Sequence, residues 1–217
     1  MQQYKKLAGQ TALYGLGTIV PRFLNYVVLT PFYTNIFSVE QYGIVTNLYA
    51  YVVFLLILLT YGLETGYFRF TKSEEEPRKV YSTIMSSLFT STLLFVVLIL
   101  IFNPSIARVL EYPDRPYLVV LFSMVVAIDA FSAVPFAKLR FEEKAKKFGY
   151  LKIFNVVVNL FFNFLFYIAF PHFYGQAGFE FLNAVYDPSL GVAYVFLSNL
   201  LASFFTLLLL LPELNIS

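Results

Sequence analysis

The sequence predicts an all-α, polytopic membrane protein, and three observations lead to that fold class. The mean hydropathy is +0.71, 59% of the residues are hydrophobic and only 13% are charged. A soluble domain of 217 residues would need a far more charged surface to cover that much apolar material. The chain also contains six continuously apolar stretches, each long enough to cross a hydrocarbon core of about 30 Å. Continuous rather than alternating apolarity favours helices over the strands of a barrel.

The six expected spans follow one another along the chain with polar connections between them. They are residues 12–36, 44–68, 80–102, 117–139, 149–170 and 190–211. Prolines at positions 21, 31 and 135 fall inside the first and fourth of them. Because proline removes a backbone donor and kinks a helix, these spans suit a bundle that bends or lines a cavity, although proline is also generally common in membrane helices.

The first span carries Arg22 near its centre. An arginine at mid-membrane costs about 2.5–3.5 kcal/mol on insertion scales, so we expect it to face a protein interior or a water-filled cavity. Asn25 and Tyr26 follow by three and four residues, which places them on the same face of a regular helix. The first span is therefore predicted to present one polar face to a cavity that receives a substrate.

The second and fourth spans each contribute an acidic residue. Asp129 is central in the fourth span, at about the depth of Arg22, while Glu64 lies near the end of the second span and Arg69 at its very end. Arg22 and Glu64 differ in depth by roughly 15 Å, too far for a direct pair unless the first helix is shifted or broken. Asp129 has two readings, as the ion-pair partner of Arg22 or as an independent proton or cation site.

The fifth span carries three asparagines at four-residue intervals, Asn155, Asn159 and Asn163. This spacing forms one polar stripe along a helix, and three asparagines facing lipid would be very unfavourable. The stripe either hydrogen-bonds neighbouring helices or lines the cavity, and the sequence favours neither reading. Asn159 and Asn199 are each central in their spans, and Asn199 belongs to the sixth, 190–211.

Lys and Arg residues alternate between the two sides of the predicted membrane. The N-terminus and the second and fourth loops hold twelve of the fifteen, the third loop holds two, and Arg22 is inside a span. Because basic loops stay cytoplasmic, the chain is predicted to have both termini in the cytoplasm. The basic segment FEEKAKKFGY of the fourth loop is expected either to anchor the orientation or to lie on anionic membrane lipids, which are expected partners.

Several classes of function are disfavoured. The chain has no cysteine, which excludes disulfides and thiolate metal sites, and no metal or cofactor motif is present. Its one histidine, His172, has no acid or nucleophile nearby in the sequence, so no catalytic residue is assigned and no enzyme is expected. A net charge of +2 gives no reason to expect nucleic-acid binding.

The residues KLAGQTALYGLGTIVPRFLNYVVLTPFYTNIFSVEQYGIVTNLYAYVVF resemble the opening of the O-antigen type oligosaccharide flippases, the polysaccharide-biosynthesis membrane proteins of a larger exporter superfamily. The shared features are the mid-span arginine and the pattern L-x-P-x-Y-T followed, after seven intervening residues, by Y-G. The segments YGLETGYFRF and AVPFAKLRFEEKAKKFGYLKIFNVVVNL fit the same family, whose members have a leucine-arginine pair before a basic loop. The resemblance extends over the whole chain.

This resemblance implies one six-helix, N-terminal lobe (residues 1–217) of a two-lobe transporter of twelve to fourteen spans. The C-terminal lobe would be a partner, and other polysaccharide assembly proteins are further candidates. The cargo would be an undecaprenyl-diphosphate-linked oligosaccharide, moved across the bacterial cytoplasmic (inner) membrane for O-antigen, lipopolysaccharide or other polysaccharide synthesis. Cavity arginines bind the diphosphate in related flippases; Arg22 matches such a position and Arg69 matches it only loosely.

The predicted function is therefore an oligosaccharide-lipid flippase that works by alternating access. The predicted cavity residues are Arg22, Asn25, Tyr26, Arg69, Asn155, Asn159 and Asn163, with Asp129 and Glu64 as candidates for an ion, proton or ion-pair site. One alternative is a multidrug or small-molecule antiporter of the same superfamily. The other is a membrane assembly protein that transports nothing, in which these polar groups would be packed, dry and bonded to one another.

Overall fold

The structure, a computed structural model, describes residues 14–21, 23–73 and 76–214. Within these ranges it contains helices and no strand. Five helical stretches within these ranges are long and apolar enough to cross a membrane, and the first and fourth of them consist of more than one helix: Val39–Ser73, Pro77–Val109, Pro116–Phe141, Ala145–Phe173 and Ala193–Leu214. The predicted all-α membrane fold is confirmed, and the first expected span, 12–36, lies partly outside the described residues.

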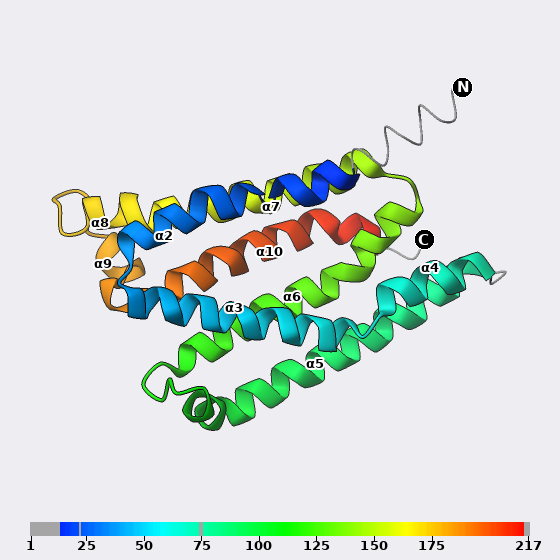
Figure 1. Cartoon of the computed structure of the whole chain (residues 1–217), viewed down its shortest axis with the longest axis horizontal. Coiled ribbons are helices and arrows are strands. Elements are labelled where there is room, and N and C mark those ends of the chain that lie inside the picture. Colours follow the sequence, from blue (N-terminus) through cyan, green and yellow to red (C-terminus); the bar gives the residue numbers. More distant parts are fainter. Residues whose placement is uncertain (1–13, 22, 74–75, 215–217) are drawn as a thin grey trace.

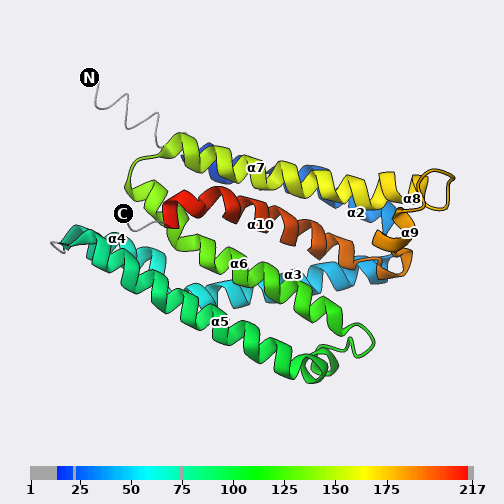
Figure 2. The same cartoon turned by 180° about the vertical axis from the view of Figure 1, so that it is seen from behind.

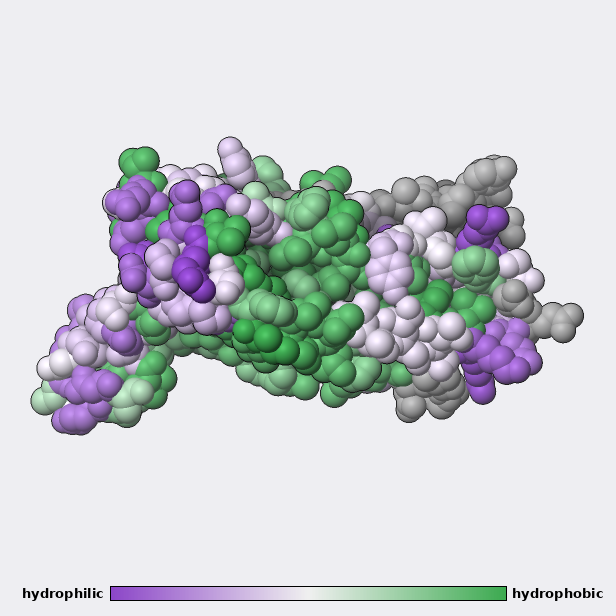
Figure 3. All heavy atoms as spheres, turned by 90° about the horizontal axis from the view of Figure 1, so that it is seen from below, coloured by the Kyte–Doolittle hydropathy of each residue, from purple (hydrophilic) through white to green (hydrophobic). Residues whose placement is uncertain are grey.

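The helices run roughly side by side along the long axis of the molecule (Figure 1). After a helical segment at residues 14–24, described except at position 22, the chain forms η1 (Asn25–Leu29), α2 (Thr30–Ile36), α3 (Val39–Thr60), α4 (Leu63–Ser73), α5 (Pro77–Val109), α6 (Pro116–Phe141), α7 (Ala145–Phe164), η2 (Leu165–Ala169), α8 (Phe170–Phe173), α9 (Leu182–Val185), η3 (Pro188–Leu190) and α10 (Ala193–Leu214). The space-filling view shows an apolar belt across the middle with polar residues at both ends, as a membrane-spanning bundle requires (Figure 3).

Helix α6 is the central element of the bundle. It packs against α3, α4, α5, α7 and α10, and seen from behind it runs between α10 and α5 (Figure 2). Its buried residues include Leu118, Val119, Val125 and Val126, which have no exposed surface. A helix that is apolar on all sides is stable only when neighbours surround it, and α6 has that surrounding.

The second expected span, 44–68, is divided into two helices. Helix α3 begins at a capping box between Ser38 and Gln41 and ends at Thr60. Tyr61 and Gly62 then have positive φ angles of 28° and 76°. Gly62 takes this conformation without a Cβ clash, so the helix turns there and α4 restarts in a new direction. The apolar pattern runs straight through this break and does not reveal it.

Two π-helical turns stand in front of prolines. The turn η1 ends at Leu29, two residues before Pro31, and η2 ends at Ala169, two residues before Pro171. A proline lacks the N–H that an α-helix would use, and widening the preceding turn accommodates its ring. The two turns lie in neighbouring segments, because η1 contacts α7 and η2 continues directly from α7.

The first helical segment approaches α7 closely at Gly17. A Cβ atom added there would lie 3.0 Å from the Cα of Gly149 and 3.4 Å from a ring atom of Phe148. We expect Gly17→Ala to lower the free energy of unfolding by about 1–3 kcal/mol, because a backbone atom must move to relieve the overlap. Thermal unfolding of the purified protein in detergent measures this.

Gly15, one half-turn earlier, is the matched control. A Cβ atom there meets nothing within 4 Å. Gly15→Ala should leave the melting temperature unchanged or raise it slightly, since alanine favours the helix. Equal effects of the two substitutions would contradict this packing of the first helix on α7.

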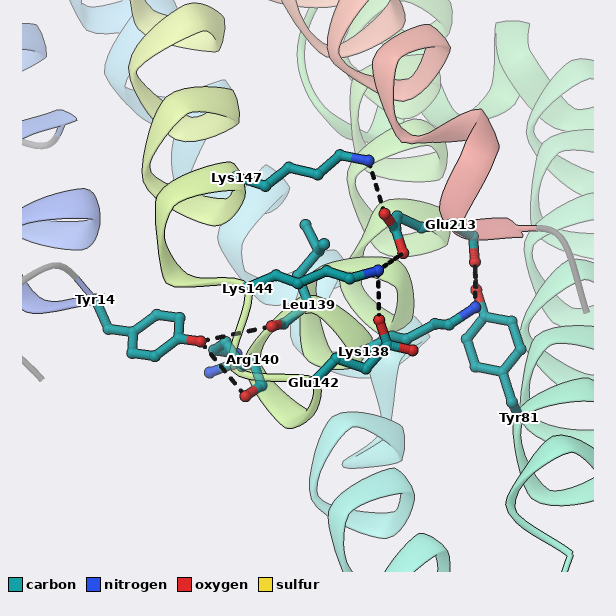
Figure 4. A network of polar contacts seen from close by, with 9 residues as sticks. All are labelled: Tyr14, Tyr81, Lys138, Leu139, Arg140, Glu142, Lys144, Lys147 and Glu213. Atoms are coloured by element: carbon teal, nitrogen blue, oxygen red, sulfur yellow. Dashed lines mark hydrogen bonds and ion pairs between the residues drawn. The ribbon is translucent and has the colours of Figure 1, made fainter. Parts of the chain in front are cut away.

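One end of the bundle, called the basic end here, carries the α4–α5 and α6–α7 connections and the end of α10. At this end Glu213 is held by several helices (Figure 4). Its carboxylate lies 2.7 Å from Lys147 Nζ and 3.4 Å from Lys144 Nζ. Its backbone oxygen accepts hydrogen bonds from Tyr81 Oη at 2.8 Å and Lys138 Nζ at 3.0 Å. Glu213 therefore ties α10 to α5, to α6 and to α7.

Replacing Glu213 with glutamine should weaken this end of the bundle. The lost pairs are expected to cost about 1–2 kcal/mol, less than a fully buried pair, because both lysines reach water. The hydrogen bond with Glu142 and the neighbouring carboxylates raise the pKa of Lys144 above its ordinary value. A lysine whose pKa is higher in the folded protein than in the unfolded chain stabilises the fold, and this stabilisation is fully present below the ordinary pKa of 10.5. It is lost as the pH rises through the higher pKa of the folded protein. Glu213→Gln should therefore lower the melting temperature near neutral pH and keep most of its fall at alkaline pH, because Glu142, the largest cause of the raised pKa of Lys144, is unchanged.

The exposed pair of Glu76 with Lys79 is the control for this variant. Its side chains are 62% and 76% exposed. Glu76→Gln should change the melting temperature little, since exposed ion pairs contribute about 0–1 kcal/mol. If both glutamine variants melt alike, the Glu213 network does not fasten the helices.

Candidate functional site

A partly open cavity of about 400 Å³ lies between the helices, in the half of the bundle that leads to the basic end. Its wall is built by the first helical segment and by α3, α4, α6, α7 and α10. The lining residues are Thr18, Leu56, Ile57, Thr60, Glu64, Asp129, Ser132, Ala133, Phe136, Arg140, Phe148, Lys152, Asn155, Ser203 and Thr206. The volume is in the range of small-molecule sites, and the mixture of charged, hydroxyl, amide and aromatic groups suits a polar ligand.

Helix α6 supplies one continuous wall of the cavity. Asp129, Ser132, Ala133, Phe136 and Arg140 all line it. Their spacing of 3, 4, 7 and 11 residues after Asp129 is that of a single helical face. The central helix therefore holds a carboxylate deep in the cavity and a guanidinium near the basic end.

The cavity contains charged groups of both signs. The Asp129 carboxylate interacts with the Ser203 hydroxyl and with the charge of Lys152. Lys152 Nζ lies 3.9 Å from the centre of the Phe136 ring, a cation–π contact. Glu64 forms an ion pair with Arg140 across α4 and α6. Charges within a membrane-spanning bundle are costly unless they have partners, and these four lie in the wall of a cavity, partly exposed.

The asparagine stripe of α7 divides into two roles. Asn155 lines the cavity, and its amide donates to Thr206 Oγ1 at 3.1 Å. Asn163 is completely buried and accepts a hydrogen bond from Tyr33 Oη at 2.7 Å, while its own amide donates to the backbone and side-chain oxygens of Asn159. Asn159 and Asn163 thus connect α7 to α2, and only Asn155 faces the cavity.

Two of the three cavity residues predicted in the first span, Asn25 and Tyr26, lie within the described residues. Arg22 lies outside the described residues; Thr18, four positions earlier in the sequence, lines the cavity. Tyr26 is 72% exposed on the outside of the bundle. Asn25 is half-buried, and its Oδ1 has no hydrogen-bond partner among the described residues. Both belong to the π-turn η1, where the spacing of a regular helix does not hold.

Arg69 is exposed on α4 and is not part of the cavity wall, whereas Arg140 and Lys152 are. Neither of these two cations is among the cavity residues predicted from the sequence. A signal for Arg140 was present, because it stands eleven residues after Asp129, on the same helical face. The contacts of Lys152 depend on how α7 packs against α6, which no local pattern reveals.

A family model described as polysaccharide biosynthesis protein matches residues 7–211. No curated protein and no solved structure matches the chain. The match covers the first expected span and all the helices that build the cavity, except the last three residues of α10.

Proposed function

The chain belongs to the polysaccharide biosynthesis protein family, and on that premise we propose that it is a flippase for undecaprenyl-diphosphate-linked oligosaccharides. It would carry this cargo from the cytoplasmic to the outer leaflet of the bacterial cytoplasmic membrane by alternating access. The N-terminus would be cytoplasmic, so that the basic end faces the cytoplasm. The described helices would form one lobe, with a second lobe completing the pathway.

The observation that carries the proposal is a cavity inside an apolar bundle that holds charges and hydrogen-bonding groups. Arg140 and Lys152 suit the phosphates of the cargo, and Asn155, Ser203 and Thr206 suit sugar hydroxyls. Polar groups inside a membrane protein are costly unless they are used, so a pathway for a polar head group explains their presence.

Complementation tests the proposal. A bacterial strain that lacks its own oligosaccharide-lipid flippase should recover surface polysaccharide when the complete coding sequence is expressed. Liposomes containing the purified protein should also expose a fluorescent undecaprenyl-diphosphate oligosaccharide to an external quencher faster than protein-free liposomes. No recovery in cells together with no acceleration in liposomes would contradict the proposal.

A multidrug or small-molecule antiporter remains the second candidate, and Asp129 favours it. A carboxylate in the cavity wall beside a lysine is suited to bind a proton or cation in exchange for a substrate. Drug efflux that depends on a proton or sodium gradient, and that is lost in Asp129→Asn, would support this candidate over the flippase.

A further inference from the structure

The connection that follows η2 and leads to α10, residues 171–191, forms a projection at the end of the bundle opposite the basic end (Figure 1). It contains α9 and η3 and is called the aromatic loop here. Its sequence, PHFYGQAGFEFLNAVYDPSLG, has five phenylalanine and tyrosine residues and no lysine or arginine. This composition suits contact with the apolar boundary of a bilayer and gives no attraction to anions.

Packing and hydrogen bonds give the aromatic loop a fixed shape. The Phe173 and Phe179 rings stack with their centres 4.5 Å apart. Tyr186 is buried and stacks on Tyr194 of α10, with the ring centres 5.1 Å apart. The Tyr194 hydroxyl accepts a hydrogen bond from the backbone N–H of Asp187 at 2.8 Å. The loop is therefore held against the first turn of α10.

Two large apolar side chains of the aromatic loop remain outside this packing. Phe181 and Val185 are 60% and 66% exposed, whereas Leu182 is 1% exposed. Residues four apart in a helical turn share one side, so Phe181 and Val185 form an exposed apolar pair on α9, and Leu182 holds the turn to the bundle. Exposed apolar side chains grouped on one side indicate a surface that meets lipid or another molecule.

The aromatic loop begins where the apolar surface of the preceding span ends. Phe161, Phe164 and Ile168 are exposed at helical spacing on that span, which marks its lipid-facing side. A hydrocarbon core of about 30 Å takes about 20 helical residues, so a span that begins near Tyr150 ends near Phe170. The loop starts at the next residue, which places it at the level of the lipid head groups.

The carboxylates of the aromatic loop are engaged in its own turns. Glu180 Oε1 accepts a hydrogen bond from the N–H of Gly178 at 3.2 Å, and Asp187 Oδ1 accepts one from the N–H of Ser189 at 2.9 Å. With no basic residue, the loop has no charge attraction to anionic lipid. The partner that fits its exposed apolar pair is a zwitterionic head-group layer with the upper acyl chains below it.

We propose that the aromatic loop lies in the head-group layer of the leaflet away from the basic end, with Phe181 and Val185 inserted among the upper acyl chains. The loop then fixes the depth of the two spans that it joins. The proposal requires only that the helices cross a bilayer, so its outcome is independent of the proposed cargo.

Tryptophan fluorescence tests this placement directly, because the sequence contains no tryptophan. Phe181→Trp and Val185→Trp are made separately, and each protein is reconstituted in phosphatidylcholine vesicles with and without bromine near the top of the acyl chains. Bromine quenches a tryptophan that it contacts, and acrylamide quenches one in water. Both variants should lose fluorescence in the brominated vesicles and resist acrylamide. Their melting temperatures in detergent should stay unchanged, since both side chains are more than half exposed.

Asp114→Trp is the matched control. Asp114 is exposed in the α5–α6 connection, at the same end of the bundle as the aromatic loop. Its tryptophan should be quenched by acrylamide and unaffected by brominated lipid. Phe181→Ser in the Val185→Trp protein should increase quenching by acrylamide and reduce quenching by lipid, because one of the two inserted groups is lost. Added salt should not reduce the lipid quenching, since no charge attraction holds the loop.

Quenching by lipid and not by acrylamide at positions 181 and 185, with the reverse at position 114, supports the anchor. If acrylamide quenches all three tryptophans equally, the loop projects into water and the inference is overturned. If neither quencher reaches positions 181 and 185, another protein segment covers them, and the inference also fails. Protection from acrylamide that arises only when a soluble oligosaccharide is added would assign the surface to sugar binding and would equally overturn the anchor.

Discussion

Replacing Arg22 with alanine should abolish polysaccharide export while leaving the protein in the membrane. Arg22 lies outside the described residues, so this expectation rests on the sequence. An arginine in the middle of a span costs about 2.5–3.5 kcal/mol, which is tolerated when the charge serves a ligand or a partner. A lost contact between a charged side chain and a phosphate is worth about 1.5–3 kcal/mol, or roughly a tenfold to hundredfold loss of affinity.

Export in a complemented strain, with immunoblotting of the membrane fraction, measures this effect. Arg22→Lys should retain part of the activity, because a lysine keeps the charge but cannot bind two oxygens side by side. Arg108→Ala, at the far end of the bundle, should export normally. Full complementation by Arg22→Ala would exclude a role for this arginine in binding an anionic cargo.

The second large effect is expected at Asn163. Asn163→Ala removes a completely buried amide, leaves the Tyr33 hydroxyl without its acceptor and opens a small void. We expect a loss of about 2–4 kcal/mol in the free energy of unfolding, the sum of an unsatisfied buried group and a cavity. Thermal unfolding in detergent measures it, and Tyr33→Phe should cost less, since polar contacts between membrane helices average about 0.6 kcal/mol.

Asn155 provides the comparison within the same helix. It is the same residue type two turns earlier, half-buried and facing the cavity. Asn155→Ala should change the melting temperature little and reduce transport, whereas Asn163→Ala should act first on stability. If both variants lose stability equally, Asn155 belongs to the packing of the bundle and not to the site.

The two asparagines also show how far the sequence could be interpreted. The four-residue spacing predicts that the three side chains share one face of α7, and Asn155 and Asn163 do lie along it. Whether that face meets a cavity or another helix changes along its length, because the first helical segment and α2 approach α7 at different heights. The spacing of the asparagines in the sequence does not tell which helix packs beside each of them.

The fold itself follows from simpler physics. The lengths of the apolar stretches predict the helices, and the described part of the chain contains five that qualify as spans. The break at Tyr61 and Gly62 was not predicted, because hydropathy is continuous there and the turn depends on a backbone conformation. That break gives α4 its own direction and brings Glu64 to Arg140, a contact between residues 76 positions apart.

The central claim is that the cavity binds the lipid-linked cargo, and the absence of cysteine from the sequence allows a direct test. Ala133, on the cavity face of α6, is replaced by cysteine, and Ser73→Cys, exposed at the end of α4, is the control. The rate of reaction with a small water-soluble thiol reagent is measured with and without undecaprenyl-diphosphate oligosaccharide. We predict that Ala133→Cys reacts and that the cargo slows its reaction, while Ser73→Cys reacts equally in both conditions. An unreactive Ala133→Cys, as in a dry and packed assembly protein, or a rate that the cargo does not change, would contradict the account.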